Sequence, residues 1–376
     1  MSHDAVRYRR APHLVSYWRR SDFIVCDYVS RREVASAPAL LELLHFLDRW
    51  RSFRDVTRRF PEVSARSLRR ALRLLVKTSH VHQSDNVERA PRGALASAVW
   101  TPEPAFFHFS TRDVPFVRID GPREDTTAAR DLRQPPPVKR YPGRRHIELP
   151  SSQADGELTR VLRARRTWRQ FGTDPVRRND LARLLELTWG VQYWVDVPGR
   201  PRMALKTSPS GGARHSIEAY VLALRIDGLA RGLYHYAPDR HALVLLKRGI
   251  TPRTVAEYLP VQEGYPRAAA LVIMTSVFDR VTARYPYARA YRSILVEAGH
   301  LCQTFCLVAT WLGLAPFCSM AFADSRIERD LKIDGVSEAA IYVAGVGTRP
   351  AGVDWAPWTE ASWPAPKRSV PRRRVG

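Results

Sequence analysis

The stretch from Ala298 to Ala323 contains no Asp, Glu, Lys or Arg, so most of it has to be buried. A helix of about 20 apolar residues is long enough to cross a bilayer. Polar and helix-terminating residues interrupt this stretch at Gln303, Thr304, Thr310, Gly313 and Pro316. We therefore predict a buried core helix followed by a turn. The N-terminus, "MSHDAVRYRRAPH", has no apolar signal-peptide core, and we expect a soluble, cytoplasmic protein without a membrane span.

The formal net charge of +23 raises the question of nucleic-acid binding. Only the tail, "PKRSVPRRRVG", is a concentrated basic block, and just six of the 60 basic residues are Lys. We interpret this Arg bias as general composition rather than as a dedicated nucleic-acid surface. The four cysteines are too few for a disulfide framework in a chain of this length. Cys302 and Cys306 lie four residues apart on the apolar helix, and we expect core thiols rather than metal ligands.

The first hundred residues are typical of a small helical module. Three amphipathic segments, 36–50, 52–60 and 64–80, predict helices, with Ser36 and Ser64 as caps. "HVHQS" then alternates like a strand. Three helices and a β-wing predict a winged-helix-like module. Such modules bind DNA through a basic third helix or grip a peptide along the wing, and the pattern leaves both open. The basic residues of the third helix are Arg66, Arg69, Arg70 and Arg73.

The remaining chain divides into three parts. Residues 101–150 form a connecting segment that ends in the proline-rich spacer "QPPPVKRYPG". Residues 151–350 mix helices with β-rich segments such as "IEAYVLALRI" and "AALVIMTSVF" without strict alternation, which predicts an α+β domain. Residues 351–376 are the basic tail.

Within "RRTWRQF", Arg165, Thr167 and Arg169 alternate, so in an extended chain they point to one side. Two guanidiniums and a hydroxyl suit a phosphate, because Arg supplies forked, charge-assisted donors. Phe171 would anchor the segment in the core. A solvated charged surface is an equally good interpretation of this stretch taken alone.

The segment "KTSPSGGARHSIEAYV" places a small, glycine-containing loop just before a strand. In such a loop backbone N–H groups can approach a flat or anionic ligand closely. Taken alone, the loop is more typical of an ordinary turn.

Together the motifs are more specific. "RRTWRQF", "SPSGGARHSIEAYV", "GLYHYAPDRHALVLLKRG", "RYPYARAYRSILVEAGHLCQTFCLVATWLGL" and "YVAGVG" follow in the order of the nitroreductase family. The sequence most resembles the branch of SagB-type azoline oxidases of ribosomal peptide biosynthesis. The resemblance implies a nitroreductase-like α+β fold, with a mixed sheet flanked by helices, in a homodimer with FMN at the subunit interface.

The resemblance also implies the cofactor-binding residues. The FMN phosphate and ribityl chain would contact Arg165, Thr167 and Arg169, with Thr replacing the family's Ser. The flavin ring would be flanked by Ser208, Pro209, Ser210 and Gly211, and its opposite face covered by "APFCSMAF", which contains Ser319. Arg349 would be a further phosphate ligand. No metal ligands are expected.

The same branch uses a Lys-Tyr pair for its chemistry, and the aligned pair here is Arg284 and Tyr285. A lysine can lose its proton in a dry pocket, whereas an arginine cannot, so Arg284 would act only as a positive charge. Tyr285 would be the base. The alternative is that Tyr285 and Tyr291 are packing aromatics. His108 and His300 are interpreted as structural, His300 as a satisfied core histidine.

The resemblance therefore implies an FMN-dependent oxidase of a peptide or peptide-derived substrate, leading from azoline to azole. A base would take the Cα proton, the flavin would take a hydride, and O₂ would reoxidise it. Expected partners are a homodimer mate and cyclodehydratase-type proteins, and residues 1–100 would bind peptide rather than nucleic acid. One alternative is an NAD(P)H-dependent FMN reductase of nitro, quinone or dehydroamino-acid substrates. Another is a flavin-less protein that recognises a leader peptide or nucleic acid.

Overall fold

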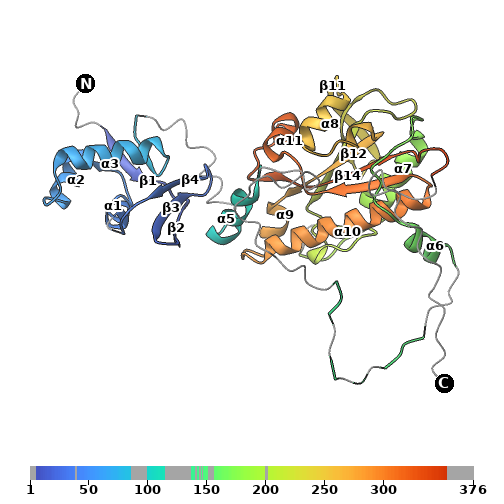
Figure 1. Ribbon diagram of the computed structural model, residues 1–376, viewed down its shortest axis with the longest axis horizontal. Coiled ribbons are helices and arrows are strands. Elements are labelled where there is room, and N and C mark those ends of the chain that lie inside the picture. The colour runs from blue at the N-terminus through green and yellow to red at the C-terminus, as the bar shows by residue number, and fades with distance from the viewer. Residues whose placement is uncertain are drawn as a thin grey trace.

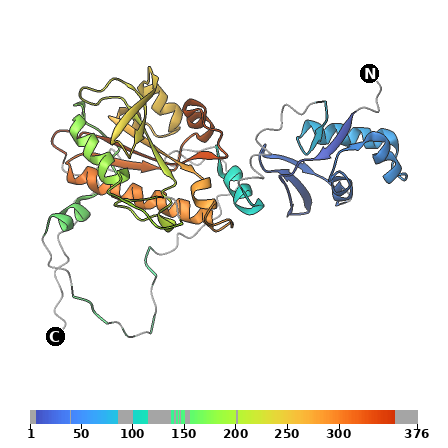
Figure 2. The same ribbon diagram turned by 180° about the vertical axis from the view of Figure 1, so that it is seen from behind.

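The computed structural model describes residues 6–38, 40–85, 100–114, 137–139, 142–143, 145, 147–150, 156–199 and 202–353. Half of the predicted proline-rich spacer and most of the basic tail lie outside these residues. Within them, an N-terminal module and a larger α+β domain are joined through one helix, α5 (Pro102–Thr111) (Figures 1 and 2).

The N-terminal module contains the three predicted helices, α1 (Leu40–Phe46), α2 (Phe53–Arg59) and α3 (Ala65–Lys77). Ser64 caps α3 as predicted, since its hydroxyl accepts a 3.1 Å hydrogen bond from the Ser67 amide. The first helix begins at Leu40 instead of just after Ser36, because Ser36 continues the sheet by donating to the Phe23 carbonyl.

Two small antiparallel sheets complete the module, and only one of their strands was predicted. The predicted strand β6 (Val81–Gln83) pairs with a strand from the N-terminus in the order β5-β1-β6. The second sheet has the order β2-β3-β4. The additional strands are β1 (Arg7–Arg10), β2 (Leu14–Arg19), β3 (Asp22–Asp27), β4 (Arg32–Ala35) and β5 (Arg51–Ser52).

The larger domain is built on a six-stranded sheet of order β11-β10-β9-β12-β14-β13. The family resemblance implied a mixed sheet flanked by helices. The helices are present, but all five pairs of neighbouring strands are antiparallel, and the parallel bridge Val176–Ile226 lies outside the named strands. The strands are β9 (Ile217–Ala223), β10 (Gly232–Ala237), β11 (Ala242–Arg248), β12 (Ala270–Val277), β13 (Ala315–Ser319) and β14 (Glu338–Gly347).

Helices cover both faces of this sheet. One hydrophobic core contains α7 (Arg178–Trp189) and α10 (Ala290–Trp311), and a second contains α8 (Pro252–Tyr258) and α11 (Asp324–Leu331). Figure 1 shows α10 crossing one face and α8 and α11 on the other. The shorter elements are α6 (Glu157–Ala164), β7 (Tyr193–Val195), β8 (Met203–Leu205), η2 (Gly211–Ala213), η3 (Tyr265–Arg267) and α9 (Asp279–Thr282).

The predicted core helix is α10, and β13 follows it after a turn at Gly313 with φ of +73°. Among the described helices α10 alone is long and apolar enough to cross a membrane by length and composition, and half of its apolar window is buried inside the fold. One side of α10 packs on the sheet, and other side chains, such as Val296 and Trp311, are exposed.

Candidate active site

The segment that follows α6 runs beside strand β13. The Trp168 amide donates a 2.9 Å hydrogen bond to the Pro316 carbonyl, and the Trp168 side chain is buried against Ala315. On the exposed side of this segment, the Arg166 guanidinium donates to the carbonyls of Arg163 and Arg165. The sequence predicted an extended segment with alternating sides. Trp168 is buried between half-buried neighbours, but Arg166 and Gln170, which alternation would place on its side, are exposed, so burial does not follow a simple two-residue alternation here.

Arg165 and Thr167 lie half-buried beside Trp168. Neither side chain donates a hydrogen bond to any residue that the structure describes. The Arg165 guanidinium lies near the Cys306 and Cys318 thiols, and its charge favours their thiolate forms. Half-buried cationic and hydroxyl donors of this kind are the donor set that a phosphate requires. The residues present therefore fit the phosphate of FMN.

Arg349, the further predicted phosphate ligand, follows the last strand. Its guanidinium donates to the carbonyls of Thr310 (3.3 Å) and Leu314 (3.2 Å), at the C-terminal end of α10, and lies 5.6 Å from the Trp168 ring centroid. The Thr310 carbonyl lies in the last turn of α10, where the negative end of the helix dipole favours a cation. Arg349 is thus next to the predicted phosphate segment, although its donors face protein carbonyls.

Ser319 ends strand β13 and is buried. Its hydroxyl accepts hydrogen bonds from the Ala321 amide at 3.0 Å and from the Gln262 side chain at 3.4 Å. Ser319 and the Arg165–Arg169 segment are therefore positioned by the same strand.

The predicted ring-flanking loop lies between β8 and β9, and three residues of α10 hold it. These residues are spaced three and four positions apart, so they share one face of the helix. The pairs are Glu297 Oε2 with Ser210 Oγ (2.7 Å), His300 Nδ1 with the Pro209 carbonyl (3.2 Å) and Thr304 Oγ1 with Ser208 Oγ (2.7 Å). The interpretation of His300 as a core histidine was wrong. Its side chain is exposed, on the solvent side of α10.

Glu297 is the most buried member of this set, at 2% exposure. Its carboxylate also accepts from the Ile217 amide at 3.2 Å and from the Ser216 hydroxyl at 3.5 Å. Burial raises the pKa of Glu297, while these donors and the nearby Lys206 lower it. Burial lowers the pKa of the Lys206 ammonium, against the pull of two carboxylates. Sequence reasoning assigned no role to Glu297 or Lys206. The available signal was Glu297 itself, because a single acidic residue on an otherwise apolar helix needs a polar partner.

Two glycines bring Tyr285 against the loop. A Cβ at Gly211 would lie 2.4 Å from Ser293 Oγ, and one at Gly212 would lie 2.7 Å from the Tyr285 hydroxyl. Gly212 also has a φ of +61°, which glycine adopts without strain. The structure thus places the predicted catalytic tyrosine and the predicted flavin-flanking loop in contact.

Arg284 precedes this tyrosine and is exposed. Its guanidinium carbon lies 6.0 Å from the Tyr285 ring centroid, and it forms no ion pair with a described residue. Tyr285 itself is partly buried against the main core, with its ring centroid 6.0 Å from that of Tyr287. The pair is therefore close to the loop, with the positive charge on the solvent side.

Three cysteines meet between α10 and β13. The Sγ atoms of Cys302, Cys306 and Cys318 lie within 4.8 Å of one another. The burial of Cys302 and Cys306 agrees with the prediction of core thiols. Cys318 joins them from the neighbouring strand, which spacing along one helix could not predict.

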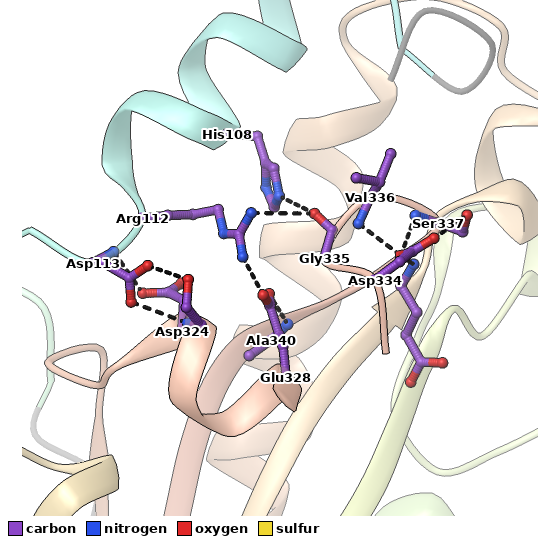
Figure 3. Close-up of polar contacts among 12 residues, drawn as sticks. His108, Arg112, Asp113, Asp324, Glu328, Asp334, Gly335, Val336, Ser337 and Ala340 are labelled. Atoms are coloured by element: carbon purple, nitrogen blue, oxygen red, sulfur yellow. Dashed lines mark hydrogen bonds and ion pairs between the residues drawn. The ribbon is translucent and has the colours of Figure 1, made fainter. Parts of the chain in front are cut away.

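A polar cluster ties α5 to α11 and to the turn before β14 (Figure 3). Arg112 pairs with Glu328, and the Asp113 amide donates to Asp324 Oδ2 at 3.0 Å. Burial raises the pKa of Asp324 to about 6 and that of Glu328 to about 7. The predicted structural role of His108 is confirmed. Its ring nitrogens lie 3.0 Å from Tyr291 Oη and 3.1 Å from the Gly335 carbonyl oxygen, and burial lowers its pKa to about 4.

Comparison with known proteins gives a family and relatives. A model described as "Nitroreductase family" matches residues 162–348. "Putative nitroreductase MJ1384" of Methanocaldococcus jannaschii is 32% identical over 50% of this chain and 89% of its own length. The trifolitoxin-processing protein TfxB of Rhizobium leguminosarum bv. trifolii is 33% identical over 36% of this chain, and the match spans only 38% of TfxB.

Among solved structures, a chain of the E. coli microcin synthetase McbBCD complex, with truncated pro-MccB17 bound, has a TM-score of 0.50. It is 20% identical, and the match covers 68% of this chain and 96% of that one. At this identity the likeness concerns the fold alone, and here it extends beyond the segment matched by the family model.

Proposed function

Because the chain belongs to the nitroreductase family, we propose that it is an FMN-dependent oxidase of a peptide or peptide-derived substrate, and that it converts azolines to azoles. The observation that carries the proposal is the contact of Tyr285 with the Gly211–Gly212 loop. It places a tyrosine, which in its phenolate form can accept a proton, at the loop expected to flank the flavin ring.

FMN would be held by two groups of residues. Arg165 and Thr167, with Arg169, provide the donors for its phosphate, and the Ser208–Gly211 loop and Ser319 border its ring. Arg349 would serve as a phosphate ligand only after exchanging its carbonyl partners for the anion. When bound, FMN supplies the hydride acceptor that no amino-acid side chain provides.

The chain's own residues would orient the substrate and move a proton. In this proposal Tyr285 Oη accepts the proton from Cα of the azoline ring. Tyr285 would act as tyrosinate and become a neutral phenol when it takes this proton. Arg284 keeps its own proton, so its contribution is to stabilise the negative charge on the tyrosinate oxygen before the transfer. Glu297 keeps the loop in place from α10.

A peptide substrate is supported by the relatives. TfxB is named as a trifolitoxin-processing protein, and the microcin synthetase structure contains a truncated precursor peptide. We therefore propose that residues 1–100 hold a peptide and that cyclodehydratase-type proteins supply the azoline. In this proposal peptide binding by the full chain changes little with salt, whereas duplex DNA binding would show the steep salt dependence of counterion release.

A second copy of the chain is supported by exposed apolar side chains. They lie on α6, on α10 and on the β7–β8 hairpin. Exposed apolar side chains on several neighbouring elements are typical of a protein–protein interface. These residues are Leu158, Leu162, Tyr193, Trp194, Val296 and Trp311. We propose that a homodimer covers them; sedimentation of the flavin-loaded protein as a monomer would contradict this.

The second candidate is an NAD(P)H-dependent FMN reductase. It is favoured by the name of the M. jannaschii relative and by Arg284 in place of a deprotonatable lysine. The test of the first proposal is to incubate the purified protein in air with a thiazoline-containing peptide. Loss of two hydrogen atoms from the peptide, without added NADPH, is the expected result. No mass change, together with consumption of NADPH in the presence of a quinone, would favour the reductase.

A further inference from the structure

A pocket of about 550 Å³ lies between the start of α5 and the loop that joins α9 to α10. Its lining is mainly apolar and aromatic, with Trp100, Tyr287 and Tyr291 as the large side chains. Asp279 and two threonines supply the polar groups. Pockets of 300–1,000 Å³ with such linings are typical of small-molecule and side-chain binding, so this pocket has room for a large side chain and its flanking backbone.

The aromatic wall of the pocket is fixed by specific contacts. The Trp100 indole N–H donates to the Val336 carbonyl at 3.2 Å, and its ring packs edge-on against Phe278 with centroids 4.3 Å apart. Tyr291 is held through its hydroxyl by His108. Because burial lowers the pKa of His108 to about 4, this wall stays neutral near pH 7. The pocket is therefore preformed and uncharged on this side.

The other wall leads to the candidate active site. The Tyr287 amide donates a 2.8 Å hydrogen bond to the Tyr285 carbonyl, and the two ring centroids are 6.0 Å apart. An extended peptide advances about 3.3 Å per residue, so this separation corresponds to about two residues. The opposite wall, α5, stacks on the N-terminal module, with the Phe109 and Tyr28 centroids 6.2 Å apart. A peptide held by that module therefore meets α5 and the pocket on its way to Tyr285.

We propose that this pocket binds a bulky apolar or aromatic side chain of the peptide substrate, about two residues from the azoline ring. The inference rests on the proposed function and adds a specificity site to it. The occupant is a substrate side chain because Tyr287, which lines the pocket, packs beside Tyr285, and because the pocket is also lined by the helix that contacts the proposed peptide-binding module.

Equilibrium binding of synthetic peptides to the purified holoprotein tests the proposal. The probes are short glycine-rich peptides with one thiazoline, carrying Phe or Gly two residues before or after the ring. For one of the two placements we expect Kd to be about tenfold lower with Phe, because its side chain leaves water. Filling the pocket by Ala288→Trp should remove this preference and leave the Kd of the all-glycine peptide within about twofold. Ala283→Trp, from an exposed lining position, serves as the second variant.

The control is Arg289→Trp, which adds the same ring at the neighbouring position outside the pocket and should keep the preference. Equal Kd values for Phe and Gly peptides in the unaltered protein would overturn the proposal, as would a preference that survives both filling variants. If a second copy or another segment of the chain occupies the pocket, the filling variants would change sedimentation and not the preference, which also overturns it. Failure of the proposed function gives a different result. In that case the protein would still bind the Phe peptide more tightly than the Gly peptide, but it would oxidise neither.

Discussion

The carboxylate of Glu297, in the middle of α10, accepts a 2.7 Å hydrogen bond from the Ser210 hydroxyl, 87 residues earlier in the chain. Through this bond and two others the core helix determines where the Ser208–Gly212 loop lies. The Ser210 hydroxyl in turn accepts from the His215 amide at 2.9 Å, which closes the loop on itself. If the loop borders the flavin ring, Glu297 is a positioning residue for cofactor binding.

We therefore predict that Glu297→Gln weakens FMN binding by about tenfold to a hundredfold. A hydrogen bond to a charged group contributes roughly 1.5–3 kcal/mol, and the carboxamide cannot accept from all the present donors. Fluorescence titration of the apoprotein with FMN measures the effect. The control is Thr310→Val, which alters another buried polar side chain of α10, one whose hydroxyl donates to the Cys306 carbonyl of its own helix. Unchanged affinity in Glu297→Gln would remove this role.

The phosphate segment gives a second prediction. Changing Arg165 and Arg169 together to Ala should lower FMN affinity by about a hundredfold or more, since each charge-assisted contact contributes about 1.5–3 kcal/mol. Arg166→Ala is the matched control, because its guanidinium donates to backbone carbonyls on the exposed side. Flavin content per chain, read from the visible spectrum, decides between them. Full flavin content in the double variant would contradict the assignment.

The cluster of Figure 3 predicts a pH dependence of stability. The folded-state pKa of Glu328, about 7, is above the ordinary Glu value of about 4.3. Between these two pH values the folded protein therefore binds more protons at this site than the unfolded chain does. The resulting stabilisation is fully present below about pH 4 and is lost as pH rises through about 7. At the upper end its loss is on the order of 3 kcal/mol.

Thermal melting from pH 5 to 8 tests this prediction when the protein is compared with Glu328→Gln. The variant cannot titrate at this site, so its Tm should fall less over the range. The comparison is needed because His108, with its pKa of about 4, makes stability rise with pH up to about pH 6.5, which opposes the effect of Glu328. Parallel Tm curves for the two proteins would show that Glu328 does not titrate in this range.

Several predictions made from the sequence depend on local patterns, and these agree with the structure. The uncharged stretch contains the second half of the core helix α10 and, after a turn, strand β13, as predicted for the helix and turn. What the sequence could not provide is pairing between distant segments. Glu297 with Ser210, Arg112 with Glu328 and Cys318 with the two helical cysteines all join residues that are close only in the folded chain. Strands β1 and β4 were missed because they are short and rich in charged residues, so their pairing rather than their pattern defines them. Strands β2 and β3 contain apolar and aromatic runs, a signal that was present in the sequence and was overlooked.

The contact between Tyr285 and Gly212 gives the next prediction. Tyr285→Phe removes only the hydroxyl, so folding and flavin content should be retained while substrate-driven flavin reduction falls by about 10². Arg284→Lys restores the Lys-Tyr pair of the branch that the sequence resembles and should preserve or raise azoline oxidation. Rapid mixing under anaerobic conditions, followed by flavin absorbance, gives both rates. Normal turnover by Tyr285→Phe would mean that the tyrosine only packs against the loop.

The most direct measurement mixes the purified protein anaerobically with a thiazoline peptide, and separately with NADPH, while the flavin absorbance is recorded. The account predicts that the protein is yellow, with about one FMN per chain, that the peptide bleaches the flavin and leaves as the thiazole, and that NADPH bleaches it far more slowly. Rapid bleaching by NADPH with no response to the peptide would contradict the account and identify a reductase.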